Sequence, residues 1–208
     1  MKRLIPLSLL GLLSLSACGS SAPGAPDGGR PPLPSGVEVR FPAAPANAYL
    51  NLLKEDGTSV YQISVAAGKT VTEVDPTGLN VLVAEARPVS AWLPATVQGT
   101  PVVSAPAAKL NFLHWIMWRD KDSDGVRDAG EELPLMTHDR VAYASEAVTL
   151  SFQTTTPDMK QTWTLAAGWS RAEHYVYLPR DTTTYLRSLE TSALKRYTLH
   201  VTTPITSQ

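Results

Sequence analysis

The sequence predicts an all-β protein, a sandwich of two packed sheets with at most one short helix. Short apolar runs that alternate with polar residues recur from residue 37 onward, at the spacing of roughly 8–12 residues that is typical of sandwiches and barrels. Turn residues separate these runs, as in Glu55-Asp56-Gly57 and Asp75-Pro76-Thr77-Gly78. Hydrophobic residues make up 43% of the chain, so the strands have enough apolar surface to form a core.

The predicted strands follow one another through the chain. They are expected at Val37–Phe41, Ala48–Leu53, Ser59–Val65, Thr70–Val74, Leu79–Ala86, Leu110–Trp118, Arg140–Tyr143, Ala147–Gln153, Gln161–Ala167, His174–Leu178 and Tyr197–Thr202. The one short helix is expected after Asp181, a candidate N-cap, with Tyr185, Leu186, Leu189 and Ala193 on one face. Residues 88–108 contain four prolines and little alternation, which indicates either a long irregular connection or a sub-boundary within the domain.

The segment Ala-Tyr-Leu-Asn-Leu-Leu-Lys-Glu-Asp-Gly-Thr at residues 48–58 resembles the opening of transthyretin-like and carboxypeptidase-regulatory-like modules. The resemblance covers only eleven residues. It implies that the sandwich is Ig-like or transthyretin-like.

A calcium-binding pattern, D-x-[DN]-x-[DN]-G-x5-E, spans residues 120–131. Calcium prefers six to eight oxygen ligands, and this pattern supplies them within one turn of chain. The expected ligands are the carboxylates of Asp120, Asp122, Asp124, Asp128 and Glu131 and the backbone carbonyl of Val126, with Gly125 at the sharp turn. The alternative is a solvated acidic turn, which Asp, Ser and Gly also favour. However, the six carboxylates between residues 120 and 132 would repel one another without a cation.

The twelve-residue loop resembles the calcium loops of EF-hands, of dockerins and of secreted bacterial β-domains. An EF-hand requires a helix on each side, but Pro134 follows Glu131 by three residues and would break the second helix. The apolar, aromatic run before the loop suits a buried strand. We therefore expect a strand–loop–strand calcium site with a structural role, inserted into the β domain.

The N-terminus carries the features of a lipoprotein signal peptide. A basic start, Lys2-Arg3, precedes an apolar segment that is too short to span a bilayer, and Leu15-Ser16-Ala17-Cys18 resembles a bacterial lipobox. The resemblance implies cleavage before Cys18 and attachment of acyl chains to Cys18, which would anchor the protein to a membrane. The expected organisation is a signal peptide at 1–17, a tether rich in Pro, Gly, Ser and Ala at 18–36, and the β domain at 37–208.

These features predict a lipid-anchored protein of the bacterial cell envelope, located in the outer membrane if the envelope has two membranes. With a net charge of −1 and no basic patch, nucleic acid is not an expected partner. We expect a binding or structural module, not an enzyme, whose partner is an unidentified envelope protein or glycan. The alternative is an envelope enzyme, or a subunit of one, acting on polysaccharide or peptidoglycan with carboxylates such as Glu173 or Glu190.

Two further groups of residues are candidates for binding. Trp163, Trp169, Tyr175 and Tyr177 can form either an aromatic platform for a ligand or part of the core. The four histidines share no metal-ligand spacing. A distant pair of them can still converge on a metal, although hydrogen-bonded histidines on strands are commoner.

Overall fold

A computed structural model describes residues 36–192 and 195–202. The predicted signal peptide, Cys18 and tether lie outside these residues, as does Ala193. The described part belongs to one compact unit that begins at Pro34. Within it, no helix is both long and apolar enough to cross a membrane.

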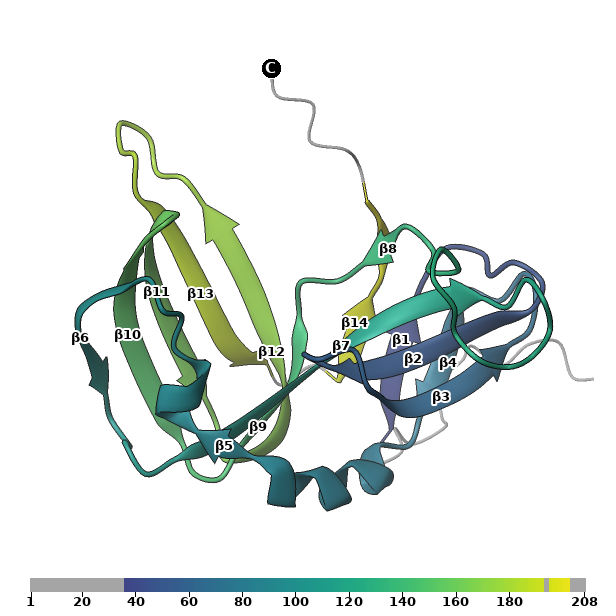
Figure 1. Cartoon of the computed structure of the whole chain (residues 1–208), viewed down its shortest axis with the longest axis horizontal. Coiled ribbons are helices and arrows are strands. Elements are labelled where there is room, and N and C mark those ends of the chain that lie inside the picture. The colour runs from purple at the N-terminus through teal and green to yellow at the C-terminus, as the bar shows by residue number, and fades with distance from the viewer. Residues whose placement is uncertain (1–35, 193–194, 203–208) are drawn as a thin grey trace, which may run out of the picture. The chain divides into compact units, whose positions relative to one another are not determined.

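The described residues form strands and two short 3-10 helices, without an α-helix (Figure 1). The first half contains β1 (Val37–Arg40), β2 (Ala48–Lys54), β3 (Ser59–Val65), β4 (Val71–Val74), η1 (Pro76–Glu85), β5 (Arg87–Pro88), η2 (Val89–Trp92), β6 (Val97–Val103) and β7 (Lys109–Arg119). The second half contains β8 (Leu135–Met136), β9 (Arg140–Ala144), β10 (Val148–Thr155), β11 (Asp158–Leu165), β12 (Gly168–Tyr177), β13 (Tyr185–Ser192), β14 (Arg196–Thr198) and β15 (His200–Val201).

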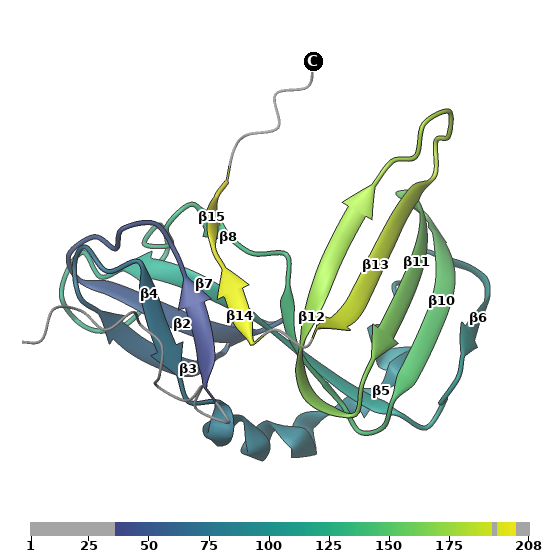
Figure 2. The same cartoon turned by 180° about the vertical axis from the view of Figure 1, so that it is seen from behind.

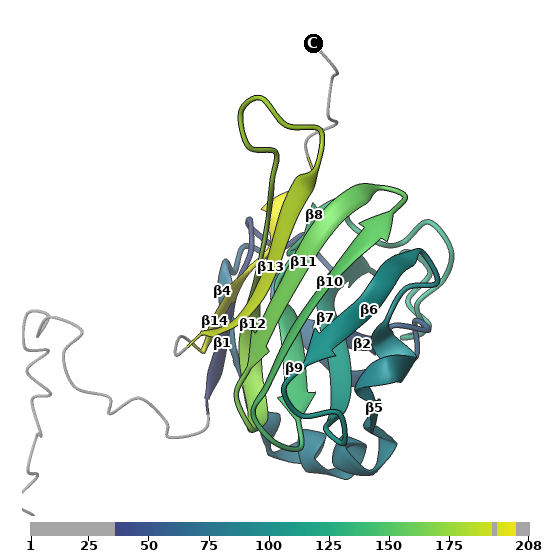
Figure 3. The same ribbon diagram turned by 90° about the vertical axis from the view of Figure 1, so that its left-hand side faces the viewer.

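Most strands belong to one ten-stranded sheet in the order β3-β2-β7-β9-β12-β13-β11-β10-β6, with β5 paired to β7. A small sheet, β14-β1-β4, lies beside the β3-β2-β7 end of the large one (Figure 2). Figure 3 shows the other end, with strands in the order β12, β13, β11, β10 and β6. Two pairs are parallel, β1 with β14 and β11 with β13, which joins segments far apart in the sequence.

The large sheet has one hydrophobic core on each side of its middle strands. The first core joins the small sheet to β2 and β7 and includes Val39, Leu50 and Tyr197. The second core lies against β10, β11, β12 and β13 and includes Leu150 and Trp163. The prediction of an all-β sandwich is therefore confirmed.

Strand β7 contributes to both cores. Successive side chains of a strand point to opposite faces, so Leu113, Trp115 and Met117 reach the first core while Leu110 and Phe112 reach the second. This double burial explains why residues 110–118 form a nearly continuous apolar run instead of alternating with polar residues.

The predicted strand at Leu79–Ala86 is wrong, because this segment lies in the 3-10 helix η1. Asp75 is the N-cap, and its Oδ1 accepts a hydrogen bond of 2.9 Å from the backbone N–H of Thr77. Pro76 follows at the first helical position, where its fixed φ and missing N–H are tolerated. Asp75-Pro76 therefore starts a helix as well as ending the preceding strand.

The predicted helix after Asp181 is also wrong, because Tyr185–Ser192 forms strand β13. This strand pairs with β12 on one side and with β11 on the other, so its backbone groups are satisfied within the sheet. Tertiary pairing overrides the helical spacing of Tyr185, Leu186 and Leu189. Strand β12 is also longer than predicted, because it begins at Gly168 instead of His174.

The position of β7 in both cores predicts that the two cores unfold together. We expect Leu113→Ala and Leu110→Ala, which remove side chains 0% and 1% exposed from the first and second core, each to lower the free energy of unfolding by about 2–5 kcal/mol. Both variants should show one shared denaturation transition, followed by fluorescence and circular dichroism. Val81→Ala, at a position 76% exposed, is the control and should change the free energy by less than about 0.5 kcal/mol. Two separate transitions, each moved by only one core variant, would contradict this.

Candidate metal centre

The predicted metal loop begins where β7 ends, and backbone hydrogen bonds close it at its base. Arg119 N–H donates to the carbonyl of Glu131 at 2.9 Å, and Leu133 N–H donates to the carbonyl of Met117 at 2.9 Å. Trp118 and Glu132 form an isolated antiparallel bridge. Strand-like pairing thus flanks the loop, and neither flank is helical, as the sequence predicts.

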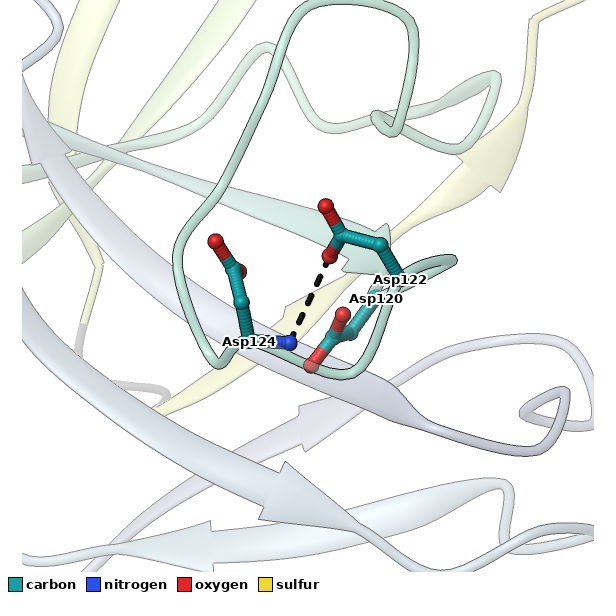
Figure 4. Close-up of side chains that lie close together, drawn as sticks. All are labelled: Asp120, Asp122 and Asp124. Carbon is teal, nitrogen blue, oxygen red and sulfur yellow. Dashed lines mark hydrogen bonds between the residues drawn. The ribbon is translucent and has the colours of Figure 1, made fainter.

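Asp120, Asp122 and Asp124 gather on one side of the loop (Figure 4). One carboxylate oxygen from each lies within 4.8 Å of the other two. This spacing brings three anionic oxygens close enough to contact a single ion. Among the described residues, this is the only group of three or more His, Cys, Asp or Glu side chains with such a geometry. The cluster can hold a metal ion.

The aspartates also shape the loop, because their carboxylates accept hydrogen bonds from its backbone. Asp120 accepts from Ser123 N–H at 2.6 Å through Oδ1 and from Gly125 N–H at 3.0 Å through Oδ2. Asp124 Oδ1 accepts from Val126 N–H at 2.7 Å. Gly125 has φ +76°, a left-handed conformation that glycine adopts without the penalty of a Cβ.

Glu131 closes the loop from its other end. Its Oε1 accepts a hydrogen bond of 2.7 Å from Lys121 N–H, and its Oε2 accepts one of 2.9 Å from Asp128 N–H. Asp120 and Glu131 are 4% and 5% exposed, and they are the only buried charged residues in the described part of the chain. Buried carboxylates need such hydrogen bonds, and these bonds fix the backbone of the loop at both ends.

The remaining predicted ligands lie outside the aspartate cluster. Of the two remaining carboxylates, that of Asp128 is exposed and that of Glu131 is buried. The structure therefore brings Asp120, Asp122 and Asp124 together and ties Glu131 to the loop backbone. It does not place the carboxylates of Asp128 and Glu131 in the same group.

The two basic residues of the loop form their hydrogen bonds and ion pair with groups other than the three clustered aspartates. Lys121 Nζ donates to the carbonyl of Gly130 at 2.6 Å, and Arg127 forms an ion pair with Glu132 and donates to the carbonyl of Gly57 at 3.1 Å. Partial desolvation, followed by the negative charges of Asp124 and Glu131, raises the pKa of Asp122. A group with a raised acid pKa opposes folding once it is ionised, so a cation at this position would remove a repulsion.

The loop is held against the strands β2 and β3. Gln62 Nε2 donates to the carbonyl of Gly125 at 3.3 Å, and Asp120 N–H donates to the carbonyl of Asn47 at 3.0 Å. Trp118, next to the loop, is 0% exposed and stacks on Tyr49 with ring centroids 4.7 Å apart. A change in the order of the loop is thus expected to alter the surroundings of Trp118.

The four candidate platform aromatics do not form one surface. Trp163 is 6% exposed and belongs to the second core, whereas Tyr175 and Tyr177 are 55% and 57% exposed on β12. The register Trp163–Leu189–His174 places Trp163 on the opposite face of the sheet from Tyr175.

Trp169 instead lines a cavity of about 430 Å³ next to the first core. Its other walls include Tyr61, Trp115, Arg171 and Tyr197. Cavities of this size can hold a small molecule. The sequence does not signal this cavity, because its walls come from strands that are distant along the chain.

The two carboxylates considered for catalysis are direct neighbours across strands β12 and β13, since Glu173 pairs with Glu190. Glu173 accepts a hydrogen bond of 2.8 Å from the Tyr175 hydroxyl and lies 3.3 Å from Nη2 of Arg171. The hydrogen bond from Tyr175, together with the Arg171 charge, lowers the pKa of Glu173. A general acid requires a raised pKa, so Glu173 lacks this property.

The loop contains two classes of carboxylate, and their substitutions should differ in the absence of metal. In excess chelator, Glu131→Gln should lower the free energy of unfolding by about 1–3 kcal/mol, because an amide cannot accept both backbone hydrogen bonds of a buried carboxylate. Asp122→Asn is the matched control at an exposed position and should change it by less than about 0.5 kcal/mol. Denaturant unfolding measures both. Equal effects would show that Glu131 does not support the loop by itself.

Comparisons with known proteins add no identification to this geometry. No protein-family model matches the chain, and no match was found among curated proteins or solved structures. The function has to be inferred from the aspartate cluster, the loop that carries it and the surfaces of the sheet.

Proposed function

We propose that the protein is a lipid-anchored module of the bacterial cell envelope, stabilised by a structural calcium ion, that acts by binding or as a structural component. The observation that carries the proposal is the convergence of Asp120, Asp122 and Asp124 within 4.8 Å on a loop between paired strands. The loop sequence and the lipobox-like segment ending at Cys18 supply the identity of the ion and the anchor.

The chemistry of the donors favours calcium over other metals. The loop offers carboxylate and carbonyl oxygens, with no histidine or cysteine, and such donors suit a hard cation. Calcium tolerates irregular, flexible coordination by six to eight oxygens, whereas magnesium requires a near-octahedral arrangement. In this proposal the ligands are Asp120, Asp122, Asp124, Asp128 and Glu131, with the carbonyl of Val126.

The site is better suited to stabilising the fold than to switching it. Both flanks of the loop are paired as strands, and Glu131 already fixes the far end of the loop through backbone hydrogen bonds. Three of the proposed ligands are already together, so binding has to move only the carboxylates of Asp128 and Glu131 within a loop whose ends are fixed. It would remove the repulsion around Asp122 and hold the loop over β2 and β3.

Two surface features support binding over catalysis. Trp169 lines a cavity, and the side chains of Tyr175 and Tyr177 are more than half exposed. Exposed aromatic side chains on one strand are a common feature of surfaces that contact a glycan or a protein. The lowered pKa of Glu173 favours a carboxylate that pairs with Arg171 over a catalytic acid.

Calcium should stabilise the protein measurably. At ten times the dissociation constant, an ion that binds only the folded state adds about 1.4 kcal/mol, or a rise of roughly 3–6 °C in the thermal midpoint for a protein of this size. Asp124→Asn should abolish this rise and leave the midpoint in chelator nearly unchanged, because Asp124 is exposed and the amide oxygen of asparagine can still accept the hydrogen bond from Val126 N–H. Differential scanning calorimetry in calcium, magnesium and chelator measures the effect. The same midpoint in all three would rule out a stabilising calcium site.

The anchor can be tested independently of calcium. Full-length protein expressed in a bacterium should partition into the detergent phase and carry the mass of acyl chains on Cys18. Cys18→Ser should abolish both, because an oxygen cannot form the thioether. Gly19→Ser, at the next position, is the control and should stay lipidated. If Cys18→Ser remained in the detergent phase, the lipoprotein proposal would fail while the calcium proposal stood.

A further inference from the structure

Basic side chains gather on one face of four strands in the middle of the large sheet. Ala172 and Leu189 belong to the second core and pair with Arg140 and His174, respectively. Paired residues share a face, and residues two apart on a strand share a face, so Arg140, His174 and Arg187 all lie on that side. His114 on β7 lies on the same face as Arg140. Its neighbour Leu113 pairs with Val141, the neighbour of Arg140, and both of these point to the opposite face.

Arg187 has no carboxylate of the described residues in contact with it, although the charge of Glu55 acts on it from a distance. In the described part of the chain, its side chain forms neither a hydrogen bond nor an ion pair, and its Nε is shielded from solvent. Burial, followed by the charge of Arg140, lowers the pKa of Arg187. An arginine nevertheless stays protonated in proteins, so this site keeps a half-buried positive charge.

The opposite face of the same strands provides an internal comparison. Arg171 Nη2 lies 2.8 Å from Oδ2 of Asp139 and 3.3 Å from Oε1 of Glu173, so two carboxylates compensate one guanidinium. On the Arg187 face, the nearby acid is Glu55, which lies 3.5 Å from Arg140. Arg171 on one face is therefore compensated by two carboxylates, whereas on the other face Arg140 and Arg187 share the single carboxylate of Glu55.

Polar atoms without partners surround Arg187. Gln161, which pairs with Arg187 across β11 and β13, is 3% exposed, and its Oε1 has no hydrogen-bond partner. His174 Nε2 is likewise buried and unpartnered. The ring of His138 lies 5.6 Å from that of His174. Buried polar groups are normally hydrogen-bonded. Gln161 Oε1 can only accept a hydrogen bond, whereas Nε2 of a His174 ring protonated on that atom can donate one to an anion beside Arg187.

We propose that this face binds an oxyanion, the carboxylate or phosphate group of a ligand, with Arg187 as its main contact and His174 and Arg140 beside it. A guanidinium presents two parallel N–H donors that match two oxygens of such a group. The anion would neutralise Arg187 and supply acceptors for the donors around it. This site is separate from the aspartate cluster and does not depend on calcium.

The protonation state of His174 provides a second way to detect an anion at this face. Burial, followed by the charges of Arg187, His138 and Arg140, lowers the pKa of His174 to about 4. At neutral pH its ring is therefore uncharged and can donate one hydrogen bond. A bound anion would favour the protonated ring, so the pKa of His174 should rise when the site is filled.

The experiment compares the full-length protein in phosphate, acetate and chloride at equal ionic strength and pH 7. We expect a saturable rise in the thermal midpoint with phosphate or acetate but not with chloride; which of the two acts at lower concentration distinguishes a phosphate from a carboxylate ligand. Arg187→Gln should weaken this response at least tenfold. Arg180→Gln is the matched control, because it removes the same charge from an exposed position, and should respond like the unmodified protein.

Two further measurements decide the outcome. In chloride, Arg187→Gln should unfold at the same midpoint or a higher one, because the substitution removes an uncompensated charge. In an NMR titration, phosphate should raise the pKa of His174 in the unmodified protein but not in Arg187→Gln. The proposal is overturned if no anion gives a saturable response, or if Arg187→Gln responds like Arg180→Gln. It is also overturned if Arg187→Gln is strongly destabilised in chloride, which would mean that the charge is compensated within the fold.

Discussion

Burial of β7 on both faces is the constraint on which the rest of the structure depends. The strand pairs with β2 from Leu113 to Arg119 and with β9 from Leu110 to Leu113, and its side chains enter both hydrophobic cores. A strand buried on both faces cannot shift its register without exposing apolar side chains. The packing of the strand therefore fixes the position of Asp120, which follows its last residue. Asp120 is the first residue of the loop that carries the aspartate cluster.

The carboxylates of the loop fall into two kinds, buried and exposed, with different roles. Asp120 and Glu131 are buried, and each accepts two backbone hydrogen bonds, so they organise the chain whether or not an ion is present. Asp122 and Asp124 are exposed, and each accepts one backbone hydrogen bond while bringing negative charge next to Asp120. Charges that a fold gathers without local compensation suit an external cation. A largely prepared loop also reduces the ordering cost of binding.

The sequence predicted the all-β class and most strands, since period-2 patterns and turn residues are local signals. At Leu79–Ala86 the strand prediction missed a local signal, the N-cap Asp75 followed by Pro76, whereas the error after Asp181 comes from a non-local effect. Tyr185–Ser192 has helical spacing but becomes a strand because β11 and β12 supply partners on both edges. The aspartate cluster follows from a local motif. The cavity beside Trp169 and the surroundings of Arg187 depend on chain segments that meet only after folding, so no local pattern in the sequence predicts them.

The two faces of strands β9, β12 and β13 carry different sets of charged residues, because successive side chains of a strand point to opposite faces. Arg171 and Glu173 are two residues apart and share a face, where Asp139 joins them. Their neighbours in sequence, Ala172 and His174, point to the opposite face, which carries the second core and Arg187. No carboxylate of β12 can reach Arg187 without reversing the strand. The carboxylate of β12 therefore cannot pair with Arg187, and Glu55, the acid whose charge does act on Arg187, is 3.5 Å from Arg140.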